Sequence, residues 1–459
     1  MFTRFSIRQR VVAICLTALA LGSCGQWRRV GSTPAADPNL LVPKMFDPTT
    51  AYGNMGFITH GEPLPFVAAI RYLAGANPDS SLGLLSLTFS NRSLSFRRGA
   101  SDFIATYRVD AVFRGGEGEE IARVSDAESV TVASFRETLG DSRIVYQDFI
   151  LVPPGATALT IRVEDVRSGV AAQSEASVEV PRFTSRPSLS SLIPVIGGTQ
   201  ARSTFRGRPD LSVNSRATVP YGRDTVKFYI EGYHTPPRSA VTLNAFSVEQ
   251  GNLVLSQNAE LVGNGDVRSV VLEVDAAQLP VGQLRFEAVL EDGVDTTSTL
   301  VLVSFSDQWI VTNFEDMLSL LRYFAPPETL NAMREATADE RVTLWREFWE
   351  VTDPDVLTAQ HEGLNDYFAR LNEANELFPE TRLAGWLTDR GEIFITLGMP
   401  DETFEPFPDP QSPIRIIRWT YITERLLLEF VDHTGLDDFR LTDRSRADYQ
   451  RVLNRLRRG

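Results

Sequence analysis

Between residues 64 and 305 the hydrophobic residues come in short runs that are separated by turn sequences such as Gly115-Gly116 and Pro153-Pro154-Gly155. The runs are rich in β-branched and aromatic residues and show no helical period, which is typical of antiparallel β-sandwiches. Strands are predicted at residues 84–89, 103–113, 130–135, 144–152, 159–163, 226–230, 253–255, 270–274, 284–290 and 299–305. We expect two all-β modules of immunoglobulin or fibronectin type, at residues 64–185 and 187–305. The alternative is one large two-sheet domain.

After Phe305 the pattern changes, and five of the six tryptophans lie between Trp309 and Trp419. Apolar residues at helical spacing predict helices over residues 313–324, 327–334, about 338–352 and 358–378. Thr337 and Glu340 have the spacing of a capping box, and Asn313 is a candidate N-cap. Alternating patterns then predict strands at residues 414–421, 426–431 and 438–441. Residues 306–443 should therefore form an α+β domain, helices first and an antiparallel meander second, followed by a basic helix at 444–459.

The stretch from Gly385 to Glu402 combines glycines, an aromatic residue, charges and strand-forming residues. Ile393 and Ile395 alternate with Phe394 and Thr396, which predicts a strand. Turns are expected on both sides of this strand, because Gly391 and Gly398 bracket it and Pro400 cannot extend a ladder.

The same stretch resembles the signature of the bacterial GWxTD-domain family. Its name is spelled by Gly385, Trp386, Thr388 and Asp389, and the resemblance extends in order from Leu321 to Gly435. The signature also takes in Arg390, Gly391, Gly398, Pro400, Asp401, Glu402 and Trp419. Met399 stands where the family more often has Pro. The resemblance implies a bacterial envelope protein, with no established chemistry.

The N-terminus has the pattern of a signal peptide, residues 1–23. Arg4, Arg8 and Arg10 precede an apolar run that is too short to span a bilayer. The run ends in Leu21-Gly22-Ser23-Cys24, which resembles the bacterial lipobox, and this implies acylation of Cys24 as the first mature residue. Residues 24–63 are then expected to form a lipid-anchored tether, with outer-membrane attachment facing the periplasm. The alternative is an ordinary secretory signal with a chance cysteine.

The formal net charge of −14 argues against nucleic-acid binding, which needs a basic face. The four histidines do not have metal-ligand spacing, and no nucleotide fingerprint is present, so neither a metal nor a cofactor is expected.

An aromatic cluster near Pro236-Pro237 consists of Tyr229, Tyr233 and His234. It forms either a ligand site or, in the favoured interpretation, the packing of a hinge between modules.

Three roles are open for the polar residues of the signature: a structural role, which we favour, ligand binding and catalysis. As an enzyme, the chain would use Asp389 or Asp401 as a general base, with Arg390 or His433 stabilising charge. As structural groups, these residues would cap turns, and an ion pair between Asp389 and Arg390 would position Trp386.

We favour a non-enzymatic envelope lipoprotein that binds a protein or glycan partner, with the β modules as a stalk and the C-terminal domain as the recognition head. The alternative function is an envelope hydrolase. The basic C-terminal helix either contacts anionic lipid or an acidic partner or, in the favoured interpretation, docks on its own acidic protein.

Overall fold

The structure is a computed structural model of the 459-residue chain. It describes residues 37–140, 142–184, 186–263, 265–306, 310–354, 361–406 and 414–456. The chain divides into two compact units, Met1–Ala35 and Ala36–Gly459, and the description below concerns the second. The predicted signal peptide and Cys24 lie outside the described residues. Within the described part, no helix is long and apolar enough to cross a membrane.

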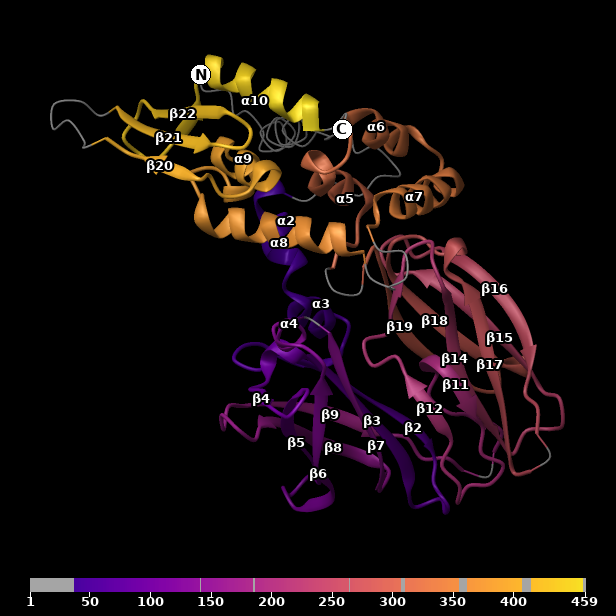
Figure 1. Cartoon of the computed structure of the whole chain (residues 1–459). Helices are drawn as coiled ribbons and strands as arrows, with labels where there is room; N and C mark the ends of the chain where they lie inside the picture. The colour runs from indigo at the N-terminus through magenta and orange to yellow at the C-terminus, as the bar shows by residue number, and fades with distance from the viewer. Residues whose placement is uncertain are drawn as a thin grey trace, which may run out of the picture. The chain divides into compact units, whose positions relative to one another are not determined.

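The first β region holds two antiparallel sheets (Figure 1). One has the order β1-β2-β3-β7, and the other has the order β4-β5-β8-β9 with β6 also paired to β5. The elements are β1 (Ile58–His60), β2 (Phe66–Ala74), β3 (Ser81–Ser90), η1 (Asn91–Ser93), β4 (Arg97–Arg98), β5 (Phe103–Arg114), β6 (Glu120–Val132), α4 (Phe135–Thr138), β7 (Arg143–Val152), β8 (Gly155–Asp165) and β9 (Ala171–Val180). Nine consecutive residues of β3 are buried, because both faces of its sheet are covered.

The second β region also holds two sheets, and its strands are antiparallel except for the parallel pair β13–β19. The elements are β10 (Ser188–Leu189), β11 (Ile193–Gln200), β12 (Asp210–Val213), β13 (Thr218–Pro220), β14 (Thr225–Tyr233), β15 (Ala240–Ser247), β16 (Leu253–Glu260), β17 (Val267–Asp275), η2 (Ala276–Gln278), β18 (Gly282–Leu290), η3 (Glu291–Gly293) and β19 (Thr296–Ser304). The rings of Phe228 and Phe286, one from each sheet, lie 4.6 Å apart between centroids.

The strand predictions overlap observed strands in both regions, although β6 ends at Val132 and Phe135 begins α4. The predictions missed the strands β1, β2, β4, β9, β10 to β13 and β15. Most of these are short, or they lack a clear run of β-branched residues. The chain is mostly β structure in antiparallel sheets, with a helical C-terminal region.

The C-terminal region has helices first and antiparallel strands after them, as predicted. Its sheet has the order β20-β21-β22-β23, and of these strands β20 was not predicted. Its elements are α5 (Phe314–Leu320), η4 (Leu321–Tyr323), α6 (Pro327–Glu335), α7 (Ala338–Thr352), α8 (Glu362–Leu377), η5 (Gly385–Leu387), α9 (Asp389–Leu397), β20 (Glu402–Phe404), β21 (Arg415–Tyr421), β22 (Leu426–Asp432), β23 (Phe439–Leu441) and α10 (Asp443–Leu456). Asn313 caps α5 through its side chain, and Thr337 with Glu340 forms the predicted capping box of α7.

The prediction of a strand at Ile393–Thr396 is wrong, because this segment is the helix α9. Thr388 caps the helix by accepting a hydrogen bond from the Gly391 amide, and Gly398 ends it with a φ of +82°. Ile393, Phe394 and Ile395 are all buried, so the helix is covered on several sides. An alternating residue pattern inside such a buried segment is therefore not evidence for a half-exposed strand.

The prediction that residues 24–63 form a tether is wrong for the described part of that range. Residues 38–54 form two short helices, α2 (Pro38–Met45) and α3 (Pro48–Asn54), each with an aspartate N-cap followed by Pro. Leu41, Val42 and Met45 of α2 are buried, and α2 packs on α5 and α8. This N-terminal segment is therefore part of the folded protein.

Candidate functional site

The signature run forms a tight turn of η5 that leads into α9. The Thr388 hydroxyl donates to the Gly385 carbonyl oxygen at 2.8 Å and accepts from the Gly391 amide at 3.0 Å. A Cβ atom at Gly391 would overlap the Gly385 carbonyl oxygen, and a Cβ at Gly385 would overlap that of Ala374 in α8. Both glycines are therefore required because η5, α8 and α9 approach one another closely.

Trp386 lies fully buried beneath this turn. The ring of Tyr323 meets it edge-on with centroids 6.5 Å apart, and the Arg322 guanidinium carbon lies 5.0 Å from the indole centroid. The indole N–H has no hydrogen-bond partner among the described residues. Trp386 therefore acts as a packing anchor between η4 and α9, stabilised in part by a cation–π contact.

Asp389 bonds to Arg446 rather than to its neighbour Arg390, so the predicted Asp389–Arg390 pair is wrong. One carboxylate oxygen lies 2.6 Å from Arg446 Nη2 and accepts the Leu441 amide at 2.7 Å. Asp389 thus joins the start of α9 to β23 and α10. Sequence reasoning did not find this partner, because 57 residues separate the two side chains.

Arg390 lies between two aromatic rings. Its guanidinium carbon is 4.5 Å from the Phe439 ring centroid and 5.6 Å from that of Phe378. Burial lowers the pKa of Arg390, although the nearby Glu380 carboxylate acts in the opposite direction. These contacts hold Arg390 in the packing between α8 and β23.

Glu380 belongs to a carboxyl cluster that the sequence analysis did not single out. Its side chain is 2% exposed, and Oε2 lies 3.7 Å from Arg440 Nη2, while Arg440 also lies 2.6 Å from Asp438. Desolvation, with a further contribution from Asp438, raises the pKa of Glu380 to about 7. A carboxyl group of this kind can exchange a proton near neutral pH, but its burial keeps it from direct contact with a substrate.

Asp401, Glu402 and His433 are placed apart from Asp389. Asp401 accepts the Ile422 amide at 2.6 Å and holds the β21–β22 turn, whereas His433 is exposed beyond the other end of β22. The seven residues of β22 correspond to about 20 Å of strand. Asp389 is the first residue of α9 and Asp401 lies beyond its other end, and the helix is about 12 Å long. Asp401 is therefore not brought together with Asp389 or with His433.

The buried Asp432 next to His433 stabilises a turn. Its carboxylate accepts the amides of Thr434, Gly435 and Asp437 and the Thr434 hydroxyl at 2.7–3.0 Å. These hydrogen bonds outweigh desolvation and lower the pKa of Asp432. No group of three metal-ligating side chains occurs in the described parts of the chain.

In the second β region, Tyr229 and Tyr233 belong to a buried polar network. Their hydroxyls donate to Glu231 at 2.7 and 2.6 Å, and Arg202 binds the same carboxylate through Nε and Nη2. Arg202 also donates to the carbonyl oxygen of Ala74, which ends β2, and the Ala74 amide donates to the Tyr233 hydroxyl. The tyrosines therefore help to join the two β regions, as the favoured interpretation predicted.

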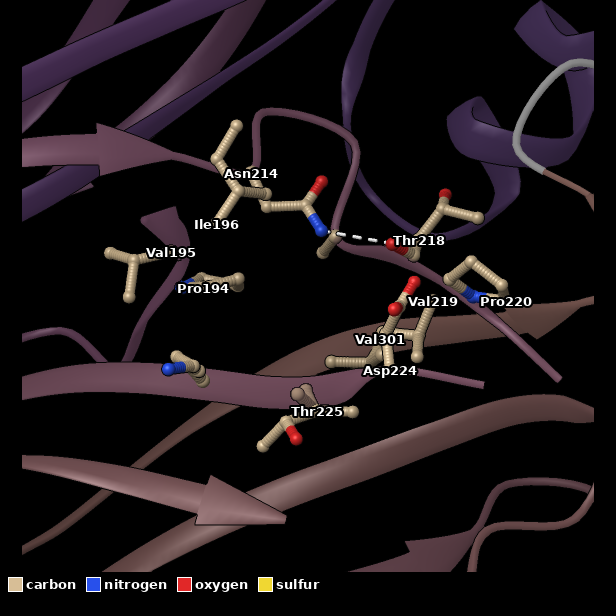
Figure 2. A pocket seen from close by; sticks show the side chains of 13 residues that line it. Pro194, Val195, Ile196, Asn214, Thr218, Val219, Pro220, Asp224, Thr225 and Val301 are labelled. Atoms are coloured by element: carbon tan, nitrogen blue, oxygen red, sulfur yellow. Dashed lines mark hydrogen bonds between the residues drawn. The ribbon is translucent and has the colours of Figure 1, made fainter. Parts of the chain in front are cut away.

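A pocket of about 470 Å³ opens where β11 separates from β14 (Figure 2). Asn214 reaches across it and donates to the Thr218 carbonyl oxygen at 2.9 Å. Lys227 lines the pocket but pairs with Glu273 at 2.9 Å. The lining is otherwise mostly apolar, and it does not show a convergent catalytic group.

Comparisons with known proteins place one part of the chain in a family. No curated protein matches the chain. Among solved structures, red sea bream transglutaminase is similar at 10% identity over 53% of this chain and 32% of that chain, with a TM-score of 0.16. Escherichia coli alpha-2-macroglobulin activated by porcine elastase is similar at 12% identity over 52% of this chain and 23% of that chain, also with a TM-score of 0.16. Scores this low do not establish a common fold. Residues 288–426 match the family model of the GWxTD domain, and this part of the chain is therefore a GWxTD domain.

Proposed function

We propose that this chain is a lipid-anchored protein of the bacterial cell envelope whose GWxTD domain binds a protein or glycan partner without catalysing a reaction. Cys24 is the acylated residue, and the protein is attached to the outer membrane facing the periplasm. The two β regions are immunoglobulin- or fibronectin-like sandwich modules. Their support is the pair of sheets in each region and the ring contact that joins the sheets of the second.

The observation that carries the binding role is the exposed edge of the GWxTD-domain sheet. β20 is the outermost strand, all three of its residues are exposed, and no described strand pairs with its outer edge. Phe404 at the end of β20 is 57% exposed, and Ile422 in the β21–β22 turn is 62% exposed. An open strand edge beside large apolar side chains is suited to adding a strand from a protein partner.

The placement of the polar signature residues supports binding over hydrolysis. Thr388, Asp389 and Asp401 are each engaged in hydrogen bonds that hold turns or join elements. A hydrolase that used Asp401 with Asp389 or with His433 would need the two groups to meet at one substrate, whereas α9 separates the first pair and β22 separates the second.

The test compares two variants that each place a charge on an exposed phenylalanine. Phe404→Glu changes the edge strand, and Phe135→Glu changes a phenylalanine of similar exposure, 62%, in the first β region. The tagged protein is cross-linked in intact cells, and the captured envelope proteins and glycans are identified. We expect Phe404→Glu to lose the captured partner and Phe135→Glu to retain it, with both variants folded by circular dichroism.

Equal capture by both variants would contradict the proposed edge. Turnover of envelope peptide or glycan substrates by the wild type, lost in a folded Asp389→Ala/Asp401→Ala double variant, would favour the hydrolase instead. Acylation is tested separately by mass spectrometry of the mature N-terminal peptide, which a Cys24→Ala variant should no longer yield.

A further inference from the structure

A basic groove of about 580 Å³ lies between α10 and the β21–β22 hairpin. Four arginines line it: Arg425 from the hairpin turn, and Arg444, Arg451 and Arg455 from α10. The last 17 residues, 443–459, contain six arginines and two aspartates, in a chain with a net charge of −14. Positive charge is therefore concentrated at the C-terminal end of an acidic protein.

The acidic residues of the groove leave this positive charge in excess. Glu429 pairs with Arg418 outside the groove at 2.8 Å, and Asp448 pairs with Arg451. Glu424 is the remaining carboxylate of the lining, and its carbonyl oxygen accepts a hydrogen bond from Arg455 at 3.5 Å. Two more arginines than carboxylates thus remain when these pairs are set aside, which favours an anionic ligand.

The helix α2 ties the same domain to the region of the anchor. The Asn39 side chain accepts the Ala384 amide at 2.8 Å, just before η5, and the Met45 carbonyl oxygen accepts the Ile310 amide at 3.0 Å. Thirteen residue steps separate Cys24 from Asp37, a distance of at most about 45 Å at full extension. A lipid at Cys24 would therefore keep the GWxTD domain close to the membrane surface, and the β regions would not act as a stalk beneath it.

We propose that the groove between α10 and the β21–β22 hairpin binds the anionic headgroups of phospholipids and turns this face of the GWxTD domain to the membrane. The nearness of the membrane rests on the proposed acylation of Cys24, whereas the affinity of the groove does not. Arginine forks bind phosphate in two-point geometry. Leu427 and Leu456, which are 57% and 51% exposed, lie on the elements that form the groove and supply apolar contacts at the interface.

The test uses residues 25–459, which lack the leader and the lipid but retain the compact unit Ala36–Gly459. Binding is measured by co-sedimentation with vesicles of phosphatidylglycerol and phosphatidylcholine, and with vesicles of phosphatidylcholine alone. We expect binding to the anionic vesicles only, weakening as salt rises. The double variant Arg444→Gln/Arg455→Gln should bind about 30-fold more weakly, from about 1 kcal/mol for each basic residue at an anionic surface.

The matched control is Arg97→Gln/Arg98→Gln, which removes the same charge from two exposed positions of β4 in the first β region. This pair should bind like the wild type. Equal loss in both double variants, or equal binding to both kinds of vesicle, would overturn the proposal. Binding to an immobilised polyglutamate peptide but not to anionic vesicles would assign the groove to an acidic protein instead. Because the protein in this assay carries no lipid, a failure here is distinct from a failure of Cys24 acylation.

Discussion

The first and second β regions contain the same kind of antiparallel sheet pairs, but their hydrophobic cores have different partners. The main core of the first region is formed only by residues between Ile58 and Phe183. The core of the second region continues into α5, α7, α8 and α9 and into the sheet of the GWxTD domain. It also takes in Leu41, Val42 and Tyr52 of the N-terminal segment. The main core of the first region is therefore its own, although β2 and β3 also pack on the second region through Leu73, Leu82 and Leu84. The second region in addition shares its interior with the GWxTD domain.

The shared core is built from contacts at one end of the second β region. The ring of Phe305, just after β19, meets that of Trp345 in α7 with centroids 4.7 Å apart. The Arg223 guanidinium carbon lies 4.3 Å from the ring centroid of Trp349, and Arg346 donates to the Gly222 carbonyl oxygen. The turn between β13 and β14 is thus packed against α7.

The family match begins inside the part of the chain that shares this core. The match starts at residue 288, inside β18, and therefore includes β19 as well as the helices. It ends at residue 426, the first residue of β22. The unit recognised by sequence thus includes strands of a β region, and the boundary predicted at residue 305 separates β19 from the helices that it packs against. We infer that the second β region and the GWxTD domain unfold together.

The largest effect is expected for Trp345→Ala, which removes a side chain that is 1% exposed at the centre of the shared core. It should destabilise the protein by about 3–5 kcal/mol. Hydrogen exchange followed by mass spectrometry should show faster exchange in both β14–β19 and α5–α9, with β5 and β8 unchanged. The buried Phe113→Ala in β5 should produce the opposite pattern.

Val351→Ala is the control for this prediction, because Val351 lies on the same helix but is 84% exposed. Its effect should stay within about 0.5 kcal/mol. If Trp345→Ala accelerated exchange in α5–α9 while β14–β19 kept their protection, the two parts would unfold independently. The shared core would then not couple their stabilities.

The second test concerns the junction between the two β regions. Arg202→Ala leaves Glu231 buried without its counter-charge, since the two side chains are 1% and 0% exposed. The expected loss is about 3 kcal/mol, measured by urea unfolding. Arg208→Ala removes an ion pair that joins the two regions directly, with Asp148 of β7, but that pair is 3.9 Å long and exposed. Loss of this exposed pair should lower the free energy of unfolding by less than about 1 kcal/mol. Equal losses for Arg202→Ala and Arg208→Ala would show that burial does not set the strength of this junction.

Local features of this fold could be predicted from sequence, and long-range ones could not. The capping box of Thr337 and Glu340 and the N-cap Asn313 depend on residues three positions apart or fewer. The helix α9 could have been identified from the Thr388 cap and Gly398, but the short apolar run also fitted a strand. The packing of Trp345 on Phe305 joins distant segments, and nothing local to either residue specifies it.

The candidate site shows the same division. The importance of Gly385, Trp386 and Thr388 was recognised from the signature, and the structure explains it by close packing. The partners of Asp389 and of Glu380 lie on β23 and α10, more than fifty residues away. A single sequence offers no signal for such pairs, so the Asp389–Arg390 pair was predicted from adjacency and was wrong. Acylation of Cys24 stays a prediction.

A smaller effect is expected from Glu380, whose pKa is raised to about 7 from 4.5. The folded protein holds this proton more tightly than the unfolded chain, so stability should fall as pH rises from about 4.5 to 7. The shift corresponds to at most about 3 kcal/mol. Glu380→Gln should flatten the dependence of the melting temperature on pH between 5 and 8. It should also raise the melting temperature itself at pH 8. Parallel profiles for the variant and the wild type would contradict the assigned proton.

The smallest effect tests what the signature threonine does. Thr388→Val removes the hydroxyl that caps α9, and it should cost about 1–2 kcal/mol because the Gly391 amide then lacks its partner in a buried turn. Thr388→Ser keeps the hydroxyl and should lose less than about 0.5 kcal/mol. Both variants should capture the partner of the β20 edge equally well once folded, because the hydroxyl bonds inward to Gly385 and Gly391. If Thr388→Ser were as stable as the wild type but lost partner capture, the threonine would have a role in recognition beyond the packing of η5 on α9.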